Sequence, residues 1–137
     1  MFERDYLVRM FARFAEAIGR SIARNKERDP EGAAATIEEA IGEATELDGD
    51  VLLSLAPESI ASVLQVSGTD PRVIEYVSRS LLLEASFLEE AGNTEKARLR
   101  ADQAYALADA YGIELSDASI TEEELAELAE RSASALE

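Results

Sequence analysis

Apolar residues recur at three- and four-residue steps along most of the chain, separated by short polar breaks. This spacing is that of amphipathic helices, whereas the period-two alternation of strands and the Asn-Gly turns of hairpins do not occur. The first helix is predicted over residues 3–26. Its apolar stripe is formed by Leu7, Met10, Phe11, Phe14, Ile18 and Ile22. The pattern predicts an all-α fold.

The second helix opens with an Asp-Pro pair at residues 29–30, where Asp is a favoured N-cap and Pro a favoured first helical residue. We expect this helix to run to about Leu47, with Gly49 as its C-terminal stop. Its inner face is predicted to consist of Ala33, Ile37, Ala40, Ile41 and Ala44.

Another Asp-Pro pair starts a helix over residues 71–91, which Gly92 ends. Asn93 or Thr94 then caps a partner helix that runs to about Tyr111. The inward residues of the former are predicted to be Ile74, Val77, Leu81, Ala85 and Leu88. Those of the latter are predicted to be Ala97, Ala101, Ala104, Leu107 and Ala108.

Two further parts of the chain complete the prediction. Residues 50–67 are less regular and indicate short helices, one near Val51 and one starting at Pro57. Thr121-x-x-Glu124 is a capping box that opens a last helix. We therefore expect one domain over residues 1–137. It comprises a first hairpin (1–48), an irregular short-helix insertion (49–69), a repeat-like hairpin (70–112) and a terminal helix (120–136).

The composition restricts the chemistry that the chain can perform. It has no Cys and no His, so disulfides, thiolate nucleophiles, Ser-His-Asp triads and His-based metal sites are excluded. No apolar run approaches the roughly 20 residues that cross a bilayer. The charged start MFERDYLVRMF is unlike a secretory signal, so a cytoplasmic location is expected.

The charge is large and uneven. The net charge is −16, with +3 on residues 1–28 and −19 on residues 29–137. Nucleic acids and anionic membranes require a cationic face, so neither is an expected partner. The chain has only two Lys against 11 Arg. This balance fits either an ordinary solvated surface or adaptation to a cytoplasm at high salt.

Large and small apolar residues alternate around a Gly-containing turn between residues 81 and 104. They are Leu81, Ala85, Leu88, Gly92-Asn93, Ala97, Ala101 and Ala104. This arrangement resembles a tetratricopeptide repeat, and Ala33, Ile37 and Ala40 repeat its last three positions 64 residues earlier. The resemblance implies antiparallel helical hairpins in a right-handed αα stack, a C-terminal capping helix and a protein-binding groove.

The N-terminus carries a second resemblance. Met1, Phe2, Asp5, Tyr6, Leu7 and Arg9 match the start Met-Phe-x-x-Asp-Tyr-Leu-x-Arg. A bacterial family of unknown function begins in this way and continues into repeat-like helices. That resemblance implies no activity.

Acidic residues are the remaining candidates for chemistry. Adjacent carboxylates such as Glu38-Glu39, Glu89-Glu90 and Glu122–Glu124 point in different directions on a helix, so we expect them to be solvated. Glu46, Asp48 and Asp50 surround Gly49, but their spacing is not that of an EF-hand. They predict a helix end with local Asx turns. No catalytic, cofactor or metal site is expected.

Two sets of residues are candidates for protein contacts. If a repeat groove exists, its exposed positions are predicted to include Asn25, Arg79, Ser86 and Glu89. The first helix is apolar on a broad side and basic elsewhere, which leaves open packing on the second helix, self-association as a homodimer, and membrane binding. The self-association face would comprise Phe2, Tyr6, Met10 and Phe14.

The sequence favours a non-catalytic protein-interaction or scaffold module with an unidentified protein partner. The alternative is a small helical ligand-binding or enzymatic domain that uses carboxylates only. A buried cluster of Asp or Glu with Arg or Tyr in a deep pocket would favour this alternative. A shallow concave face without buried charge would favour the interaction module.

Overall fold

The computed structural model describes residues 2–115 and residue 127, and within these residues it consists of helices and connecting loops. The helices are α1 (Phe2–Lys26), α2 (Pro30–Thr45), α3 (Gly49–Leu52), α4 (Pro57–Ser67), α5 (Pro71–Glu90) and α6 (Thr94–Tyr111). The all-α prediction is confirmed. Apart from residue 127, the predicted terminal helix (120–136) and its capping box lie outside the described residues.

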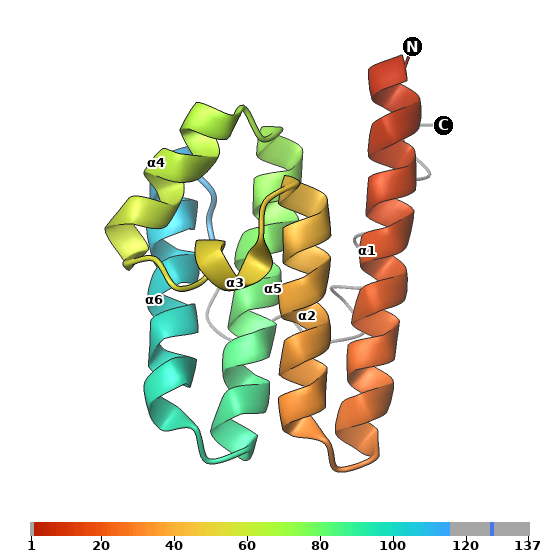
Figure 1. Cartoon of the computed structure of the whole chain (residues 1–137), viewed down its shortest axis with the longest axis vertical. Helices are drawn as coiled ribbons and strands as arrows, with labels where there is room; N and C mark the ends of the chain where they lie inside the picture. Colours follow the sequence, from red (N-terminus) through yellow and green to blue (C-terminus); the bar gives the residue numbers. More distant parts are fainter. Residues whose placement is uncertain (1, 116–126, 128–137) are drawn as a thin grey trace.

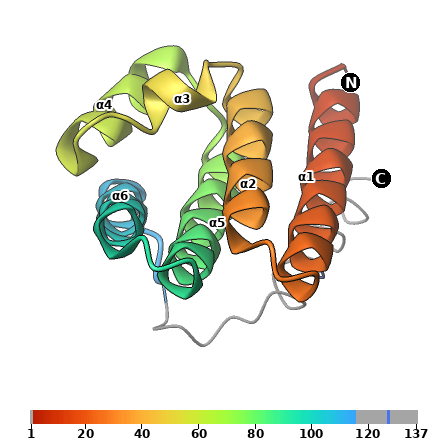
Figure 2. The same ribbon diagram turned by 60° about the horizontal axis from the view of Figure 1, so that its bottom comes forward.

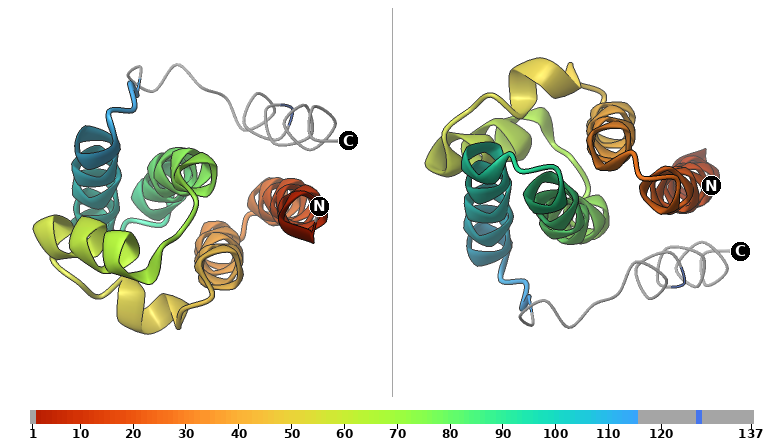
Figure 3. Two further views of the ribbon diagram at one scale, coloured as in Figure 1. Left: turned by 90° about the horizontal axis from the view of Figure 1, so that it is seen from above. Right: turned by 90° about the horizontal axis from the view of Figure 1, so that it is seen from below.

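Four long helices run roughly parallel or antiparallel to one another, in the spatial order α1, α2, α5, α6 (Figure 1). α5 packs against α2 on one side and α6 on the other, so it is the central helix of the group. The short helices α3 and α4 lie together on one side of the long helices (Figures 2 and 3). α3 contacts α2 and α4 contacts α6, so the insertion connects the two hairpins (Figure 3).

The predicted N-caps form as expected. Asp29 Oδ1 accepts a hydrogen bond from Gly32 N at 3.0 Å, and Asp70 Oδ1 accepts one from Arg72 N at 2.8 Å. Asn93 caps α6 through Lys96 N at 3.3 Å. Each cap satisfies a backbone N–H that the first helical turn leaves unpaired, which fixes where the helix starts.

The end of α2 differs from the prediction. The helix stops at Thr45, and Glu46 takes the left-handed conformation (φ 60°) at its C-cap. Gly49 is the first residue of α3, and Asp48 caps that helix. A side chain is excluded at Gly49 because a Cβ there would lie 2.7 Å from the backbone oxygen of Glu38. Gly49 therefore serves the contact between α3 and α2 rather than the end of α2.

The core follows the predicted stripes, with two exceptions. All the predicted inward residues of α2 and α5 are buried, and Leu7, Phe11, Phe14, Ile18 and Ile22 of α1 are buried with them. Met10 and Ala101 are only partly buried. α1 reaches α5 through aromatic rings, with the centroids of Phe11 and Tyr76 4.9 Å apart in an edge-to-face arrangement.

None of the helices described here is both long and apolar enough to cross a membrane.

Candidate functional site

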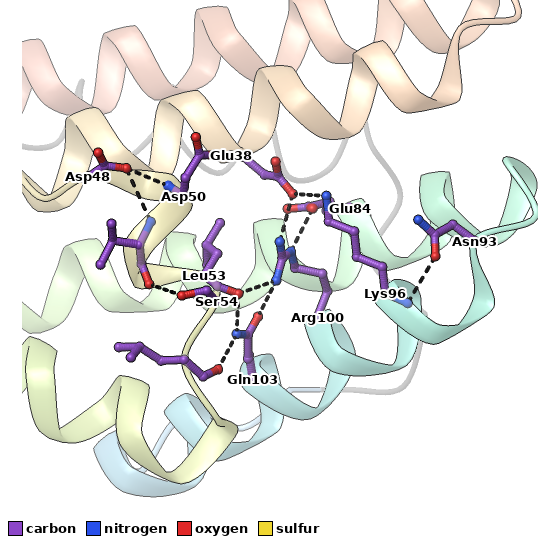
Figure 4. A network of polar contacts seen from close by, with 12 residues as sticks. Glu38, Asp48, Asp50, Leu53, Ser54, Glu84, Asn93, Lys96, Arg100 and Gln103 are labelled. Carbon is purple, nitrogen blue, oxygen red and sulfur yellow. Dashed lines mark hydrogen bonds and ion pairs between the residues drawn. The ribbon is translucent and has the colours of Figure 1, made fainter.

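Four polar side chains meet inside the helical group, and we refer to them as the interior cluster (Figure 4). They are Glu38 of α2, Glu84 of α5, and Arg100 and Gln103 of α6. The Arg100 guanidinium donates from Nε to Glu84 Oε2 at 2.8 Å and from Nη2 to Glu38 Oε2 at 2.9 Å. One cation thus joins the carboxyl groups of two other helices.

The same cluster holds the insertion against α6. Arg100 Nη1 donates to the backbone oxygen of Leu53 at 2.7 Å and to Gln103 Oε1 at 3.0 Å. Gln103 Nε2 donates to the backbone oxygens of Leu53 and Leu55, at 3.0 and 2.9 Å. These carbonyls lie between α3 and α4, where no helix satisfies them. The side chains of α6 replace the missing backbone partners.

The pKa values of the two carboxyl groups of the cluster are shifted in opposite directions. Burial raises the pKa of Glu84 well above its usual value, and the hydrogen bond with Glu38 and the charge of Glu38 raise it further, against the effect of Arg100. Burial also opposes ionisation of Glu38. Hydrogen bonds from Glu84, Arg100 and Lys96, with the charge of Arg100, outweigh it and lower the pKa of Glu38 to about 2.

Burial therefore favours the neutral acid at Glu84, whereas hydrogen bonds and the charge of Arg100 favour the carboxylate at Glu38. Oε1 of Glu84 has no hydrogen-bond partner in the described part of the chain. Lys96 Nζ lies 3.1 Å from Glu38 Oε2 and adds a partly exposed cation at the outer edge. In the neutral form of Glu84 that burial favours, the half-buried carboxylate of Glu38 balances the buried guanidinium of Arg100.

The interior cluster is closed to solvent. Glu84 and Gln103 have no exposed surface, and Arg100 is 5% exposed. Glu38 alone reaches an open depression of about 480 Å³, which α2 and the start of α3 line together with Leu47 and Asp48. A buried acid–arginine cluster is thus present, but it does not lie in a deep pocket. Its geometry suits cross-linking of helices better than contact with a substrate.

A second site lies on the surface between α1 and α2, and we call it the α1–α2 groove. It has a volume of about 310 Å³. Its walls are formed by Tyr6, Arg9, Met10, Arg13 and Phe14 of α1 and by Ala40, Glu43 and Ala44 of α2 with its C-cap residue Glu46. The α1 wall is basic, the α2 wall is acidic, and the residues between them are mainly apolar.

The charged groups of this groove are mostly unpaired. Among residues 2–115, neither Arg9 nor Arg13 forms an ion pair, although both are exposed. Tyr6 is 38% exposed. Partial burial, followed by the charge of Glu46 and a hydrogen bond to it, raises the pKa of the Tyr6 hydroxyl. The groove therefore offers an aromatic ring and two free guanidiniums to solvent.

The predicted self-association residues lie largely in this groove. Tyr6, Met10 and Phe14 all line it, although Phe14 is 3% exposed and packs toward Tyr76 in the core. Phe14 contributes to the floor of the groove rather than to an exposed face. The side chain of Phe2 lies outside the described residues.

The predicted repeat-groove residues have a different location. Ser86 and Glu89 are exposed on α5, and Asn25 is half-buried near the end of α1. Arg79 is also half-buried, and its Nε lies 3.9 Å from Glu75 Oε2. None of the four lines the α1–α2 groove or the depression beside Glu38. Their role in binding stays a prediction.

The prediction that paired carboxylates are solvated holds for Glu39, Glu89 and Glu90, which are exposed, but is wrong for Glu38. Glu38 is drawn inward because Arg100 supplies a buried positive charge on the facing helix. Asp48 forms the expected Asx turn by accepting from Asp50 N at 3.0 Å. In the described part of the chain, no three acidic side chains are grouped as a metal site would require.

Sequence reasoning missed Glu84, Arg100 and Gln103, but a signal for the first two is present. Glu84 follows Leu81 by three residues and precedes Leu88 by four, so it lies on the apolar stripe of α5. Arg100 lies three residues after Ala97 and four before Ala104, on the stripe of α6. Opposite charges on the inner faces of two consecutive helices indicate a buried ion pair.

No protein-family model matches the chain, and no curated protein or solved structure is significantly similar to it. The tetratricopeptide resemblance and the N-terminal resemblance thus stay predictions. The geometry of the two sites is the basis for the function proposed below.

Proposed function

We propose that the protein is a non-catalytic interaction module that binds a helical protein segment in the α1–α2 groove. The observation that carries this proposal is the groove itself, where an exposed Tyr6 ring lies beside Arg9 and Arg13, whose guanidiniums form no ion pair within residues 2–115. Tyrosine and arginine are the residue types that most often dominate protein interfaces. A free cation pair on an otherwise acidic protein is consistent with contact to carboxylates of a partner.

The closed interior cluster supports a non-catalytic role. Every donor nitrogen of Arg100 takes part in an internal hydrogen bond, and Gln103 holds two backbone carbonyls. A general acid or base needs to lie within hydrogen-bond reach of a substrate. Glu84 has no exposed surface through which a substrate would reach it.

The architecture supports two finer parts of the proposal. Ala33, Ile37 and Ala40 belong to α2, and Ala97, Ala101 and Ala104 belong to α6, so both small-residue patterns occur on the second helix of a hairpin. We therefore propose that the two hairpins are tetratricopeptide-like units in a right-handed stack. The sequence contains no Cys and so forms no disulfide bond. This supports a cytoplasmic location, because disulfide bonds are rare in the reducing environment of the cytoplasm.

The experiment that tests the proposal is photo-crosslinking from the groove. A benzophenone amino acid replaces Tyr6 in one variant and Val66 of α4, which is 89% exposed, in a matched control. We expect protein adducts from position 6 that are absent from position 66 and that disappear when Arg9→Glu and Arg13→Glu are added. Equal adduct patterns from both positions would overturn the proposal.

A second candidate function rests on the interior cluster. Two carboxyl groups whose pKa values shift in opposite directions are the usual pattern of an acid–base pair, and Glu38 and Glu84 have this property. Carbodiimide labelling of the native protein tests this alternative, with the exposed Glu90 as the internal standard. Labelling of Glu84 as fast as that of Glu90 would favour a ligand-binding or enzymatic domain. Labelling only after unfolding would remove this alternative.

A further inference from the structure

The α1–α2 groove has a charge pattern that is complementary to itself. Its α1 wall carries Arg9 and Arg13, and its α2 wall carries Glu43 and Glu46. The two walls run side by side in antiparallel directions (Figure 1). All four charged residues are exposed. A surface with a basic edge and an acidic edge can pair with an identical surface, provided that the two copies are turned suitably.

The symmetry of a dimer decides whether these edges match. Two copies that meet face to face in a closed dimer are related by a twofold axis lying in the interface. If the axis runs across the helices, α1 faces the second copy's α1 and the arginines oppose arginines. If the axis runs along the helices, α1 faces the second copy's α2, and Arg9 and Arg13 oppose Glu43 and Glu46 on both sides.

We propose that the occupant of the α1–α2 groove is a second copy of this chain, docked about a twofold axis parallel to the helices. This inference rests on the proposed function and names the partner of the same groove. The dimer joins α1 and α2 of each copy into a four-helix arrangement in which α1 is antiparallel to both neighbouring α2 helices. Such bundles are a common way to bury two-helix faces.

The residues between the charged walls provide the apolar part of the interface. Tyr6 and Met10 are only partly covered in the single chain, whereas Ala40 and Ala44 are buried at the floor of the groove. The groove volume of about 310 Å³ gives the second copy's Tyr6 ring room to lie against the α2 wall. The shared α1–α2 face is about 24 Å long, because α2 has 16 residues and rises about 1.5 Å per residue.

The charge pattern also explains how two acidic chains associate. Each copy carries a net charge of −16, which opposes association in general. Residues 1–28 are the part of the chain with a positive balance, and they form α1 with its following turn. Docking through α1 therefore brings the least repulsive part of one copy to the acidic α2 of the other.

A charge-swap experiment tests the inference by sedimentation at constant ionic strength. The wild type is expected to form a dimer in the micromolar range. Arg9→Glu with Arg13→Glu makes both walls acidic, and Glu43→Arg with Glu46→Arg makes both walls basic. Each variant is expected to weaken dimerisation at least about tenfold, because like charges then oppose each other on both sides of the axis. Lys26→Glu with Arg98→Glu lowers the net charge by the same amount as the arginine variant, at exposed positions outside the groove, and is expected to leave the dimer intact.

The decisive sample is a mixture of the two groove variants. The proposed axis brings an acidic α1 against a basic α2 on one side and a basic α1 against an acidic α2 on the other, so a heterodimer forms with near wild-type affinity. Unchanged far-ultraviolet circular dichroism of each variant shows that it is folded. A monomeric wild type, or a mixture that stays monomeric, overturns the inference.

The crosslinking variant at position 6 separates this inference from the proposed function. An adduct with twice the mass of the chain is expected for a second copy. Adducts only with a different protein would overturn the second-copy inference and leave the interaction module standing. Position-6 adducts no different from those of position 66 would overturn both.

Discussion

Arg100 connects more parts of the molecule than any other side chain of the interior cluster. Its guanidinium contacts Glu38 of α2, Glu84 of α5 and the backbone of Leu53 in the insertion. Removal of this one side chain leaves the buried carboxyl group of Glu84 without its hydrogen-bond partner. It also leaves Glu38 with Lys96 alone and the carbonyl of Leu53 with Gln103 alone. Unpaired buried groups carry a larger penalty than the net benefit of the intact pair.

We expect Arg100→Ala to lower the free energy of unfolding by about 3–5 kcal/mol, the usual effect of removing one partner of a buried ion pair. Arg98→Ala is a matched control, because Arg98 lies two residues away on the same helix and is exposed. Its effect should stay within about 0.5 kcal/mol. Urea unfolding followed by circular dichroism measures both. Similar losses for the two variants would show that the cluster does not stabilise the fold.

The raised pKa of Glu84 gives a second expectation at this scale. Because the folded pKa of Glu84 is raised, the folded state holds the proton more tightly, and its stabilising contribution is complete below the unfolded pKa. The contribution decreases as the pH rises from about 4.5 through the folded pKa. Glu38 has the opposite sign, since its lowered pKa gives stability that is lost between about pH 4.5 and 2.

Glu84→Gln keeps the shape and the hydrogen-bonding capacity of the neutral acid without an ionisable proton. We expect this variant to be about as stable as the wild type near pH 4.5 and increasingly more stable than it toward pH 9. Chemical unfolding at several pH values gives the difference. A variant that is equally destabilised at every pH would show that Glu84 acts as a carboxylate in the folded protein.

At the scale of elements, helix starts and apolar faces were predictable from the sequence, whereas contacts between distant segments were not. Asp29, Asp70 and Asn93 cap helices as local sequence indicates, because an N-cap depends on only a few neighbouring residues. Gly49 was misread as a stop because its purpose is a close approach to Glu38, which is 11 residues earlier. The interior cluster was missed for the same reason, since its partners come from three helices and a loop.

The contact between α3 and α2 can be tested with two glycines. Gly49→Ala places a methyl group 2.7 Å from the backbone oxygen of Glu38, and backbone atoms cannot move aside as a flexible side chain would. We expect the free energy of unfolding to decrease by about 1–3 kcal/mol, which is typical of overpacking. Gly19→Ala on α1 meets no atom within 4 Å and should stabilise the protein by about 0.5–1 kcal/mol. A neutral or stabilising Gly49→Ala would contradict the close approach.

At the scale of the whole molecule, the few charged groups of the interior are paired, whereas the chain as a whole is strongly acidic. Arg100 pairs with Glu38 and Glu84 inside the helical group, and the net charge of −16 arises mostly after residue 28. Like charges on a small protein repel one another and weaken the compact state. Salt screens exposed charges over distances beyond about 8–10 Å at physiological strength but acts little on buried pairs.

Added salt should therefore raise the stability of the protein without affecting the interior cluster. We expect the thermal midpoint to increase steadily from dilute buffer to molar KCl, as high-salt adaptation of the surface would require. The decrease in the thermal midpoint caused by Arg100→Ala should be nearly the same at both ends of this range, because Arg100 is 5% exposed. Thermal melts of the two proteins across the KCl series measure both effects at once. A midpoint that does not change with salt would contradict the surface-repulsion argument. If the decrease in the thermal midpoint caused by Arg100→Ala instead depended on salt, dissolved ions would have to reach the interior cluster.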